Sequence, residues 1–435
     1  MLENYKNKKI AVIGYGKEGK STIDFLIKNN IDIENIYLLD GKNDLILEEK
    51  HNGINTVFGN KYLDNLDFFD IIIKSPGTSY YNEKIFAVKE KLSSGMQIFF
   101  ENYKGKVICI TGTKGKSTTS SLVYEILKKA GFNTIFLGNI GNPVLSSLDF
   151  SANYDFVVLE MSSYMLEGLK KENFISVLGN IYPDHLDWHK NFENYSNAKI
   201  NILNGSEINL VFDETDDKFQ LEKKYKNIKT FGKNGYYKFV KNNFYINNKI
   251  IFDDREIKLI GEHNRYNILV SLRICDIVGI DFLLLKELIK EFNPLPHRME
   301  FIGTFKGIEF YDDAISTTPE STIASLNTFK EKIGTIFLGG LDRGYEFQSL
   351  IKKLEEFNIK NIVLFPDSGK KIKQLLDKTY NFIETSDMEE AVDFAYKYTE
   401  TGKICLLSCA SPSYSIWKNF EEKGDLFKKI VQSYK

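Results

Sequence analysis

The sequence predicts an α/β protein of three domains: an N-terminal Rossmann-like domain, a central doubly wound sheet with a P-loop, and a C-terminal Rossmann-like domain. Three observations support this prediction. Short apolar runs alternate with amphipathic helical patterns, which is typical of parallel sheets with helices on both faces. Two of these runs lead directly into glycine loops, GYGKEG and TGTKGKST. Two prolines in FNPLPHR then interrupt the pattern before a further series of apolar runs.

The predicted strands divide among the domains in chain order. The first domain, 1–102, has strand-type runs at 8–14, 35–40 and 69–77. The second domain, 103–294, continues the pattern and adds hairpin-like runs with Asn-Asn and Asn-Lys turns; its runs lie at 106–112, 133–139, 156–163, 175–180 and 239–252. The third domain, 295–435, has runs at 308–313, 334–340, 361–366 and 403–410.

Composition excludes several classes of protein. The chain has 435 residues, is 43% hydrophobic and 27% charged, and carries a formal net charge of -2. This charge gives no global attraction to nucleic acid or to an anionic membrane, so we expect neither as a partner. No apolar run approaches the ~18 residues of a membrane span. The four cysteines have no CxxC spacing, which favours a reduced, cytoplasmic location.

The loop TGTKGKST has the features of a phosphate-binding loop. Gly112 and Gly115 permit tight turns, Lys116 supplies a positive charge, and Ser117 or Thr118 can ligate Mg²⁺. The usual spacing GxxxxGK[ST] needs a glycine at position 110, which is isoleucine here, so the loop is a shortened variant. It follows a strand and opens a helix, which favours nucleoside triphosphate binding. The alternative is a glycine turn with a solvated lysine.

The loop GYGKEG matches GxGxxG at Gly14, Gly16 and Gly19, and Asp40 ends the next strand. Taken alone, this spacing indicates NAD. The same geometry also holds other pyrophosphate-linked nucleotides at a helix N-terminus. A purely structural turn is a third interpretation. Together the two loops suggest two phosphorylated ligands.

Polar residues after the next strands are candidates for a metal site. Glu160 ends a buried strand, where a carboxylate can face the P-loop across the switch point of a doubly wound sheet. His185 lies in a loop between Asp184 and Asp187, so it can ligate a cation or orient a carboxylate. Lys199 follows 14 residues later in a helical stretch. A chance acidic strand end and surface positions for the histidine and lysine are the alternatives.

Three further residues are candidates for nucleotide contacts. Asn264 and Asn267 lie one helical turn apart at a helix start, where they either cap the helix or bind a purine edge. Arg298, beside the prolines, is a natural clamp for phosphate oxygens, or else part of a structural salt bridge. His51 and His189 have no spaced partner, so we expect surface positions for both.

Several motifs together resemble those of the ATP-dependent Mur ligases over nearly the whole chain. They are TGTKGKST, GNIGNP, LEMSSYMLE, NIYPDHLDWH, YSNAKINI, GEHNRYN, PLPHRME and FYDDAISTTPEST. The runs LGGLDRG and LLSCASPSYSIWKNFEEKGDLFK are most similar to members that add glutamate. The resemblance implies a peptidoglycan-precursor enzyme, expected to be a monomer. ATP would phosphorylate the carboxylate of UDP-MurNAc-L-alanine, and the glutamate amine would then attack the acyl phosphate.

The resemblance also assigns roles to individual residues. The expected ATP contacts are Gly112, Thr113, Lys114, Gly115, Lys116, Ser117, Thr118, Asn264, Asn267, Arg298 and Asp313. Two Mg²⁺ ions are implied, one held by Ser117 or Thr118 with Glu160, and one by His185 and a carbamylated Lys199. The expected UDP-substrate contacts are Gly14, Tyr15, Gly16, Lys17, Asp40, Ser75 and Asn139. Glutamate would meet Thr317, Arg343, Ser413 and Phe420, and the catalytic residues would be Lys116, His185 and Lys199.

The sequence departs from the family pattern at two positions. The usual N-D-S-K-A-T-N run is DDAISTT here, so Ile315 replaces a lysine. Arg343 stands where lysine is common, which retains the charge and changes its shape. These departures leave L-glutamate open as the substrate. The sequence is also compatible with a different Mur-type or folylpolyglutamate-type ligase, with an inactive nucleotide-binding regulator that senses cell-wall precursors, and with an NAD-dependent oxidoreductase.

Overall fold

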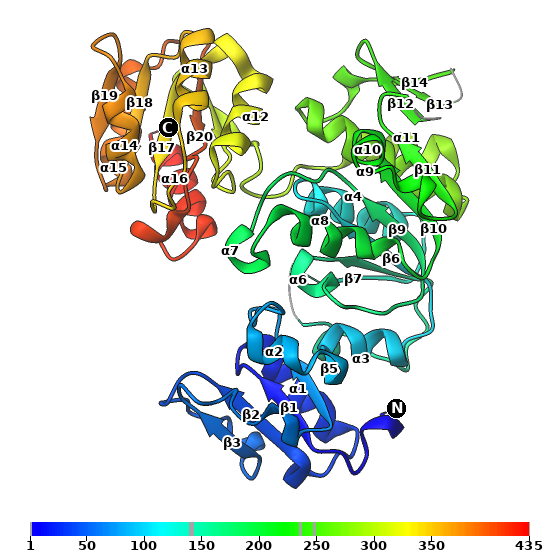
Figure 1. The fold of residues 1–435 in the computed structure, drawn as a ribbon. Coiled ribbons are helices and arrows are strands. Elements are labelled where there is room, and N and C mark those ends of the chain that lie inside the picture. The colour runs from blue at the N-terminus through cyan, green and yellow to red at the C-terminus, as the bar shows by residue number, and fades with distance from the viewer. Residues whose placement is uncertain (1, 139–142, 235–236, 247–248, 435) are drawn as a thin grey trace. The chain divides into compact units, whose positions relative to one another are not determined.

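The structure is a computed structural model that describes residues 2–138, 143–234, 237–246 and 249–434 (Figure 1). Residue contacts divide the chain into two units. The first comprises 1–256 and 266–290, and the second comprises 257–265 and 291–435. Parallel sheets flanked by helices make up most of both units, so the α/β fold class is confirmed. The predicted domain limits at 102 and 294 stay a prediction.

The N-terminal sheet is parallel, with strand order β3-β2-β1-β4-β5. Alternate residues of β1 face opposite cores, because Ile10 and Val12 join one hydrophobic cluster and Ala11 and Ile13 join another. Helices cover the sheet as crossovers between parallel strands. The elements are β1 Ile10–Ile13, α1 Lys17–Lys28, β2 Ile36–Asp40, β3 Asn55–Phe58, β4 Ile71–Lys74, α2 Glu83–Ala87, β5 Leu92–Ser93 and α3 Gly95–Asn102.

The central sheet is also parallel, with order β11-β10-β9-β6-β8-β7. Its strands are β6 Val107–Thr111, β7 Thr134–Gly138, β8 Phe156–Glu160, β9 Asn173–Leu178, β10 Ser206–Phe212 and β11 Ile228–Phe231. Val107 and Cys109 of β6 join the cluster that also contains Ile10, so the N-terminal and central sheets share one core. Ile108 and Ile110 face the opposite side, with Val123 of α4 (Lys116–Lys129).

The remaining elements of the first unit surround this sheet. Its helices are α5 Val144–Ser147, α6 Ser163–Leu166, α7 Leu186–His189, α8 Phe192–Ile200 and α9 Asp213–Phe219, together with most of α10 Glu262–Val278 and α11 Phe282–Glu291. A small antiparallel sheet contains β12 Tyr237–Val240, β13 Asn243–Ile246 and β14 Lys249–Asp253. Lys241 and Asn242, between β12 and β13, both have positive φ, which confirms a turn near the predicted Asn-Asn pair.

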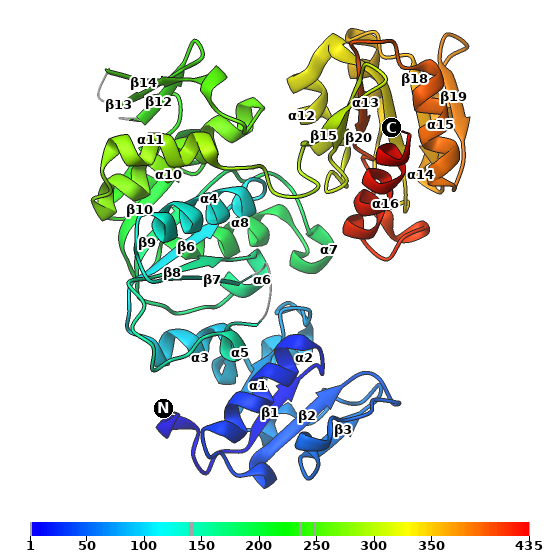
Figure 2. The same ribbon diagram turned by 180° about the vertical axis from the view of Figure 1, so that it is seen from behind.

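The sheet of the second unit has order β15-β16-β20-β17-β18-β19, with only β15 antiparallel among these strands. Helices α12, α13 and α14 contribute to the core with Ile336 and Leu338 of β17, whereas α15 and α16 pack with Phe337 on the opposite face (Figure 2). The elements are β15 Glu300–Phe305, β16 Ile308–Asp312, α12 Pro319–Phe329, β17 Ile333–Gly339, α13 Gln348–Glu356, β18 Asn361–Phe365, α14 Ser368–Leu375, β19 Asn381–Glu384, α15 Met388–Tyr398, β20 Ile404–Leu407 and α16 Phe420–Ser433.

Every strand-type run predicted from the sequence contains an observed strand. The prediction omitted β3, β5, β10, β11, β15 and β19, most of which lie at or near a sheet edge. In the described part of the chain, no helix is both long enough and apolar enough to cross a membrane.

Candidate active site

The P-loop follows β6, an interior strand of the central sheet, and leads into α4. Gly115 has a φ of 83° at the N-cap of α4, a conformation that glycine adopts readily. A side chain at Gly115 would collide with Oδ1 of Asn267 in α10. Nζ of Lys116, the first residue of α4, donates to the carbonyl of Thr113 at 3.1 Å. The positive end of a helix and a lysine amine therefore lie beside one loop, an arrangement suited to phosphate.

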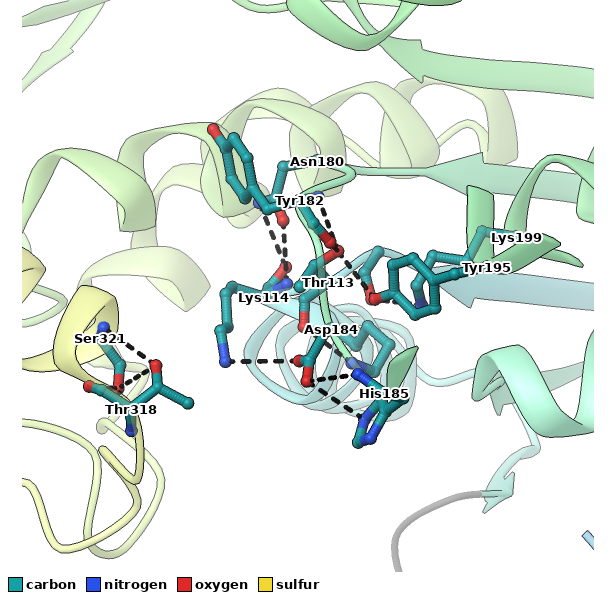
Figure 3. A network of polar contacts seen from close by, with 12 residues as sticks. Thr113, Lys114, Asn180, Tyr182, Asp184, His185, Tyr195, Lys199, Thr318 and Ser321 are labelled. Atoms are coloured by element: carbon teal, nitrogen blue, oxygen red, sulfur yellow. Dashed lines mark hydrogen bonds and ion pairs between the residues drawn. The ribbon is translucent and has the colours of Figure 1, made fainter. Parts of the chain in front are cut away.

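The segment that follows β9 holds the P-loop in place (Figure 3). The Thr113 N–H donates to the Asn180 carbonyl at 2.7 Å, and the Lys114 N–H donates to the Asn180 side-chain oxygen at 2.9 Å. Oγ1 of Thr113 accepts the Tyr182 N–H at 3.0 Å and lies 2.9 Å from the Tyr195 hydroxyl in α8. The loop is thus ordered by its own neighbours, which lowers the entropic cost of binding a ligand.

Lys199 of α8 is buried against the P-loop and is only 1% exposed. Its Nζ donates to the Gly112 carbonyl at 2.8 Å, and lies 3.4 Å from Thr111 Oγ1 and 5.1 Å from the centre of the Tyr195 ring. Burial, and after it the charge of Lys116, lower the pKa of Lys199 well below its ordinary 10.5. The lowered pKa favours the neutral, nucleophilic form of the amine relative to an exposed lysine.

Carboxylate and hydroxyl oxygens lie on the elements around this lysine. Glu160 is fully buried at the end of β8, paired in register with Ile110 of β6. Its charge opposes the lowering of the Lys199 pKa. Ser117 and Thr118 occupy the first turn of α4 and are each 7% exposed. Because Mg²⁺ prefers oxygen ligands, this donor set fits a magnesium ion beside a bound phosphate.

His185 lies immediately before α7 with a positive φ of 53°. The backbone N–H of His185 donates to Oδ1 of Asp184 at 3.0 Å. The second carboxylate oxygen of Asp184 lies 3.8 Å from Nζ of Lys114. Burial lowers the pKa of His185; Asp184 opposes this effect, and Lys116 and Lys199 add to it. The neutral imidazole, which is the form that ligates metals, is therefore favoured.

The Asp40 side chain accepts two backbone hydrogen bonds, one of them from the glycine loop of the N-terminal sheet. One carboxylate oxygen of Asp40 accepts the Tyr15 N–H at 2.8 Å, and the other accepts the Lys42 N–H at 3.0 Å. Gly14 has a φ of 91°, and the Ser75 hydroxyl lies 3.5 Å from the Gly14 carbonyl. The Asp40 carboxylate therefore orders the backbone of the glycine loop, and its predicted contact with a nucleotide-linked ligand stays a prediction.

The two predicted asparagines lie at the start of α10, as expected. Oδ1 of Asn267 accepts from the Thr119 hydroxyl of α4 at 3.1 Å. Nδ2 of Asn264 donates to the Ile260 carbonyl at 2.7 Å. Asn267 therefore contacts the helix that begins at the P-loop, and the predicted purine contacts of both residues stay a prediction.

Three predicted glutamate contacts follow three neighbouring strands of the second unit. Thr317 follows β16, Arg343 follows β17 and Ser413 follows β20, in a sheet where β20 lies between the other two. The loop after β17 is bonded to the loop after β20, because the Leu341 N–H donates to the Pro412 carbonyl at 2.8 Å. Ser413 is buried and Arg343 is exposed. Their carboxyl-end position is where open α/β sheets bind ligands.

Asp313 also follows β16 and is 3% exposed. Its carboxylate accepts hydrogen bonds from the hydroxyls of Ser325 at 2.6 Å and Ser408 at 2.8 Å, and from the Met299 N–H at 3.3 Å. Burial raises the pKa of Asp313 from 3.8 to about 6. Arg298, the predicted residue that precedes Met299, is partly buried. Phe420, the first residue of α16, is also partly buried.

Comparison with known proteins identifies the family. Residues 110–275 match the Mur ligase middle domain, and residues 297–410 match the Mur ligase glutamate ligase domain. The chain is 34% identical over 462 residues to a UDP-N-acetylmuramoylalanine--D-glutamate ligase of Acetivibrio thermocellus, covering 98% of this chain and 97% of that protein. The chain belongs to the Mur ligase family. A protein of the same name from Clostridium botulinum strain Hall is also 34% identical, with the same coverage of both chains.

Solved structures agree with this Mur ligase in fold. MurF ligase from Thermotoga maritima, in complex with ADP, has a TM-score of 0.62 at 16% identity, covering 99% of this chain and 96% of that one. UDP-N-acetylmuramate-alanine ligase from Thermotoga maritima has a TM-score of 0.60 at 21% identity, covering 99% and 100%. The resemblance predicted from the motifs is therefore confirmed for family and fold.

Two sequence predictions about this Mur ligase were wrong. His51 and His189 are fully buried rather than on the surface. Nδ1 of His51 lies 2.7 Å from the Tyr15 hydroxyl, and Nε2 of His189 lies 2.9 Å from Ser163 Oγ. Isolated histidines carry no periodic signal of burial, so these contacts were not visible in the sequence. Asn139 lies outside the described residues.

Sequence reasoning also missed Tyr195 and Asn180, which hold the P-loop of the Mur ligase. Tyr195 precedes Lys199 by four residues in α8, so the two share one helical face, and this spacing was an available signal. Asn180 had no comparable signal, because its partner Lys114 lies 66 residues away.

Gly115→Ala is expected to weaken ATP binding by the Mur ligase about tenfold, because the left-handed conformation costs a non-glycine residue roughly 1–2 kcal/mol and the new methyl group displaces Asn267. Calorimetric titration of ATP measures the effect. Gly131→Ala is the matched control, since Gly131 has a φ of 94° and no heavy atom within 4 Å of the added methyl. Equal ATP affinity in both variants would contradict the role given to this glycine.

Asp313 is expected to make stability depend on pH in the Mur ligase. The folded chain binds the carboxyl proton of Asp313 more tightly than the unfolded chain does. The contribution of this protonated carboxyl to the free energy of unfolding is therefore complete below pH 3.8 and is lost as pH rises to about 6. The free energy of unfolding decreases by about 3 kcal/mol at most over this pH range. Calorimetric melting between pH 4 and 6.5 should therefore show a shallower dependence on pH for Asp313→Asn than for the wild type. Asp377→Asn removes an exposed carboxylate of lowered pKa and should leave the wild-type dependence unchanged in this range.

Proposed function

We propose that this Mur ligase uses ATP to join D-glutamate to UDP-N-acetylmuramoyl-L-alanine in peptidoglycan precursor synthesis, acting as a monomer in the cytoplasm. One observation carries the proposal: the P-loop, the buried Lys199 and the carboxylate of Glu160 lie together at one edge of the central sheet. The names and near-complete coverage of the relatives from Acetivibrio and Clostridium support the choice of both substrates.

ATP is proposed to bind with its phosphates on the P-loop. The N–H groups of α4 and the amine of Lys116 would meet the β- and γ-phosphates. Bound Mg²⁺ would supply positive charge that offsets the charge developing on the transferred phosphoryl group. Two ions are proposed, one with Ser117 or Thr118 and Glu160, and one with His185 and Lys199.

Lys199 is proposed to be carbamylated. Its neutral amine nitrogen attacks the carbon of CO₂, forming an N–C bond and releasing one proton, which leaves a carbamate anion on the side chain. The lowered pKa of Lys199 supports this step, because only the neutral amine has the lone pair that attacks. The product is an oxygen ligand of the kind that Mg²⁺ prefers, whereas a protonated lysine would repel the ion.

The proposed chemistry has two steps. A carboxylate oxygen of the alanyl group attacks the γ-phosphorus of ATP, and the bond to ADP breaks as the acyl phosphate forms. The free amine of D-glutamate then attacks the acyl carbon, inorganic phosphate leaves, and the nitrogen loses a proton. Lys116 would stabilise charge on the phosphoryl oxygens in the first step.

The remaining predicted contacts complete the proposed substrate sites. Adenine would meet Asn264 and Asn267, and the ribose and phosphates would meet Arg298 and Asp313. The UDP group would bind the N-terminal glycine loop, with Gly14, Tyr15, Gly16, Lys17, Asp40, Ser75 and Asn139. Glutamate would bind at Thr317, Arg343, Ser413 and Phe420, where the guanidinium of Arg343 can bind a carboxylate in a bidentate manner.

The test is phosphate release from ATP by the purified protein with Mg²⁺ and UDP-MurNAc-L-Ala. D-glutamate, L-glutamate, L-lysine and meso-diaminopimelate are supplied separately. Release that requires D-glutamate is expected. Release with L-glutamate in its place would overturn the stereochemical assignment, and the absence of release with either glutamate would overturn the proposed function.

A further inference from the structure

Residues 74–81, here termed the junction segment, join the N-terminal sheet to the helix that follows His185. Lys74 ends β4 and is 6% exposed, and its Nζ lies 5.4 Å from the centre of the Trp188 ring in α7. The Ser79 hydroxyl donates to the Trp188 carbonyl at 2.9 Å. Both contacts connect residues more than 100 positions apart in the chain, so they depend on the folded arrangement of the first unit.

Tyr81 supplies a second hydrogen bond from the junction segment, in addition to that of Ser79. The Tyr81 hydroxyl donates to Oε2 of Glu167 at 2.8 Å, and the Tyr81 ring packs edge-on against Trp188, with ring centres 6.0 Å apart. The same carboxylate oxygen of Glu167 lies 3.9 Å from Nδ1 of His189, which is fully buried. The junction segment therefore contacts both aromatic residues of α7.

Backbone and ring contacts connect these aromatic residues to His185. The carbonyl of His185 accepts the N–H groups of Trp188 at 3.2 Å and of His189 at 3.1 Å. The Tyr164 ring packs against all three side chains, with ring centres 5.1 Å from His185, 4.7 Å from Trp188 and 5.6 Å from His189. By contrast, the His185 side chain is 46% exposed. Its backbone has a positive φ, which persists only where surrounding structure holds it.

We propose that Trp188 is a positioning residue for His185, and that the junction segment holds Trp188 in place. The inference rests on the proposed function for the assignment of His185 to a divalent cation. Ser75, one of the proposed UDP-substrate contacts, belongs to the junction segment. A substrate bound at Ser75 therefore stabilises the segment that positions the cation ligand, and by linkage the cation strengthens substrate binding by the same factor.

Lys74 is buried, and the Glu167 side chain is 15% exposed. Burial lowers the pKa of Lys74 to about 8, and the charge of Glu167 opposes this effect. Burial also raises the pKa of Glu167. Burial is the largest cause of both shifts, so each reflects the packing of protein atoms around these two side chains.

The test measures binding of Mn²⁺ by electron paramagnetic resonance, with the full chain and β,γ-methylene-ATP present throughout. UDP-MurNAc-L-Ala is expected to tighten Mn²⁺ binding by the wild type about fivefold or more. The double variant Ser79→Ala/Tyr81→Phe should bind Mn²⁺ about tenfold more weakly and lose the response to the UDP substrate. Its affinity for the UDP substrate in EDTA should stay within about twofold of wild type, because the glycine loop is unchanged.

Tyr5→Phe is the matched control, since the Tyr5 hydroxyl donates to Oε2 of Glu101 at 3.0 Å within the N-terminal part of the chain, away from α7. This variant should keep wild-type Mn²⁺ binding. Ser79→Ala alone removes one hydroxyl and provides the test if the double variant does not fold. Wild-type Mn²⁺ affinity in the junction variants, or an equal loss in Tyr5→Phe, would overturn the positioning role. A wild-type protein that binds Mn²⁺ as expected and catalyses no ligation would overturn the proposed function alone.

Discussion

Replacing Lys199 with alanine should lower the ligation rate about a thousandfold, while a short carboxylic acid such as propionate restores part of the lost activity. The first effect follows from the loss of an anionic cation ligand, since charge stabilisation of this kind is worth several kcal/mol, or about 10³ in rate. The second follows because a free carboxylate can occupy the space that the carbamate would fill. Phosphate release with all substrates present, with and without the added acid, measures both effects.

The control for this prediction is a second buried lysine, which lies two residues before β9. Lys171 is 8% exposed, and its Nζ donates to the Asn204 carbonyl at 3.0 Å and to Ser206 Oγ at 3.2 Å. Lys171→Ala removes similar buried contacts far from the P-loop, and no carboxylic acid should restore any activity that it loses. Full activity of Lys199→Ala without added acid would remove the carbamate from the mechanism.

Lys116→Met should reduce kcat/KM for ATP by a factor on the order of 10²–10³, the usual effect of deleting one charged donor to a transition state. The Lys116 amine is held over the P-loop by the Thr113 carbonyl, at the position where a γ-phosphate would acquire charge. Most of the loss should appear in kcat, because the interaction strengthens as the phosphoryl group transfers. Steady-state kinetics with ATP varied at saturating UDP-MurNAc-L-Ala and D-glutamate separate the two parameters.

Lys128→Met is the matched control for Lys116→Met. Lys128 lies on an exposed position in the last turn of the same helix and packs over Tyr124, with its Nζ 5.4 Å from the ring centre. This variant should keep wild-type kinetics. A Lys116→Met enzyme whose KM for ATP rises at constant kcat would show that the lysine contributes only to binding of ATP.

The strands that the sequence predicted share a strong local pattern. Central strands such as β6 (VICIT) and β17 (IGTIFLG) are largely apolar, because both faces of a parallel sheet are covered by helices. The omitted edge strands lack this pattern. β19 lies at a sheet edge with the sequence NFIE, and β15, also at an edge, contains Gly303 within EFIGTF. Edge strands bury less surface, so their sequences are less constrained.

The site was predictable where its chemistry is local in sequence. The P-loop glycines and Lys116 fall within eight consecutive residues, and the backbone conformation of Gly115 follows from that local pattern. Long-range packing was not predictable, because no periodicity connects Thr113 to Tyr195, 82 residues away, or Ser79 to Trp188, 109 residues away. The burial of Lys199 belongs to the same class, since it depends on where α8 packs against the loop after β6.

The most direct test of the central claim follows oxygen atoms from substrate to phosphate. UDP-MurNAc-L-Ala labelled with ¹⁸O in its alanyl carboxylate is incubated with the protein, ATP, Mg²⁺ and D-glutamate, and the phosphate released is analysed by mass spectrometry. An acyl phosphate transfers one carboxylate oxygen to phosphate, so each phosphate formed should carry one ¹⁸O atom. Unlabelled phosphate, with or without an amide product, would contradict activation of the carboxylate by ATP.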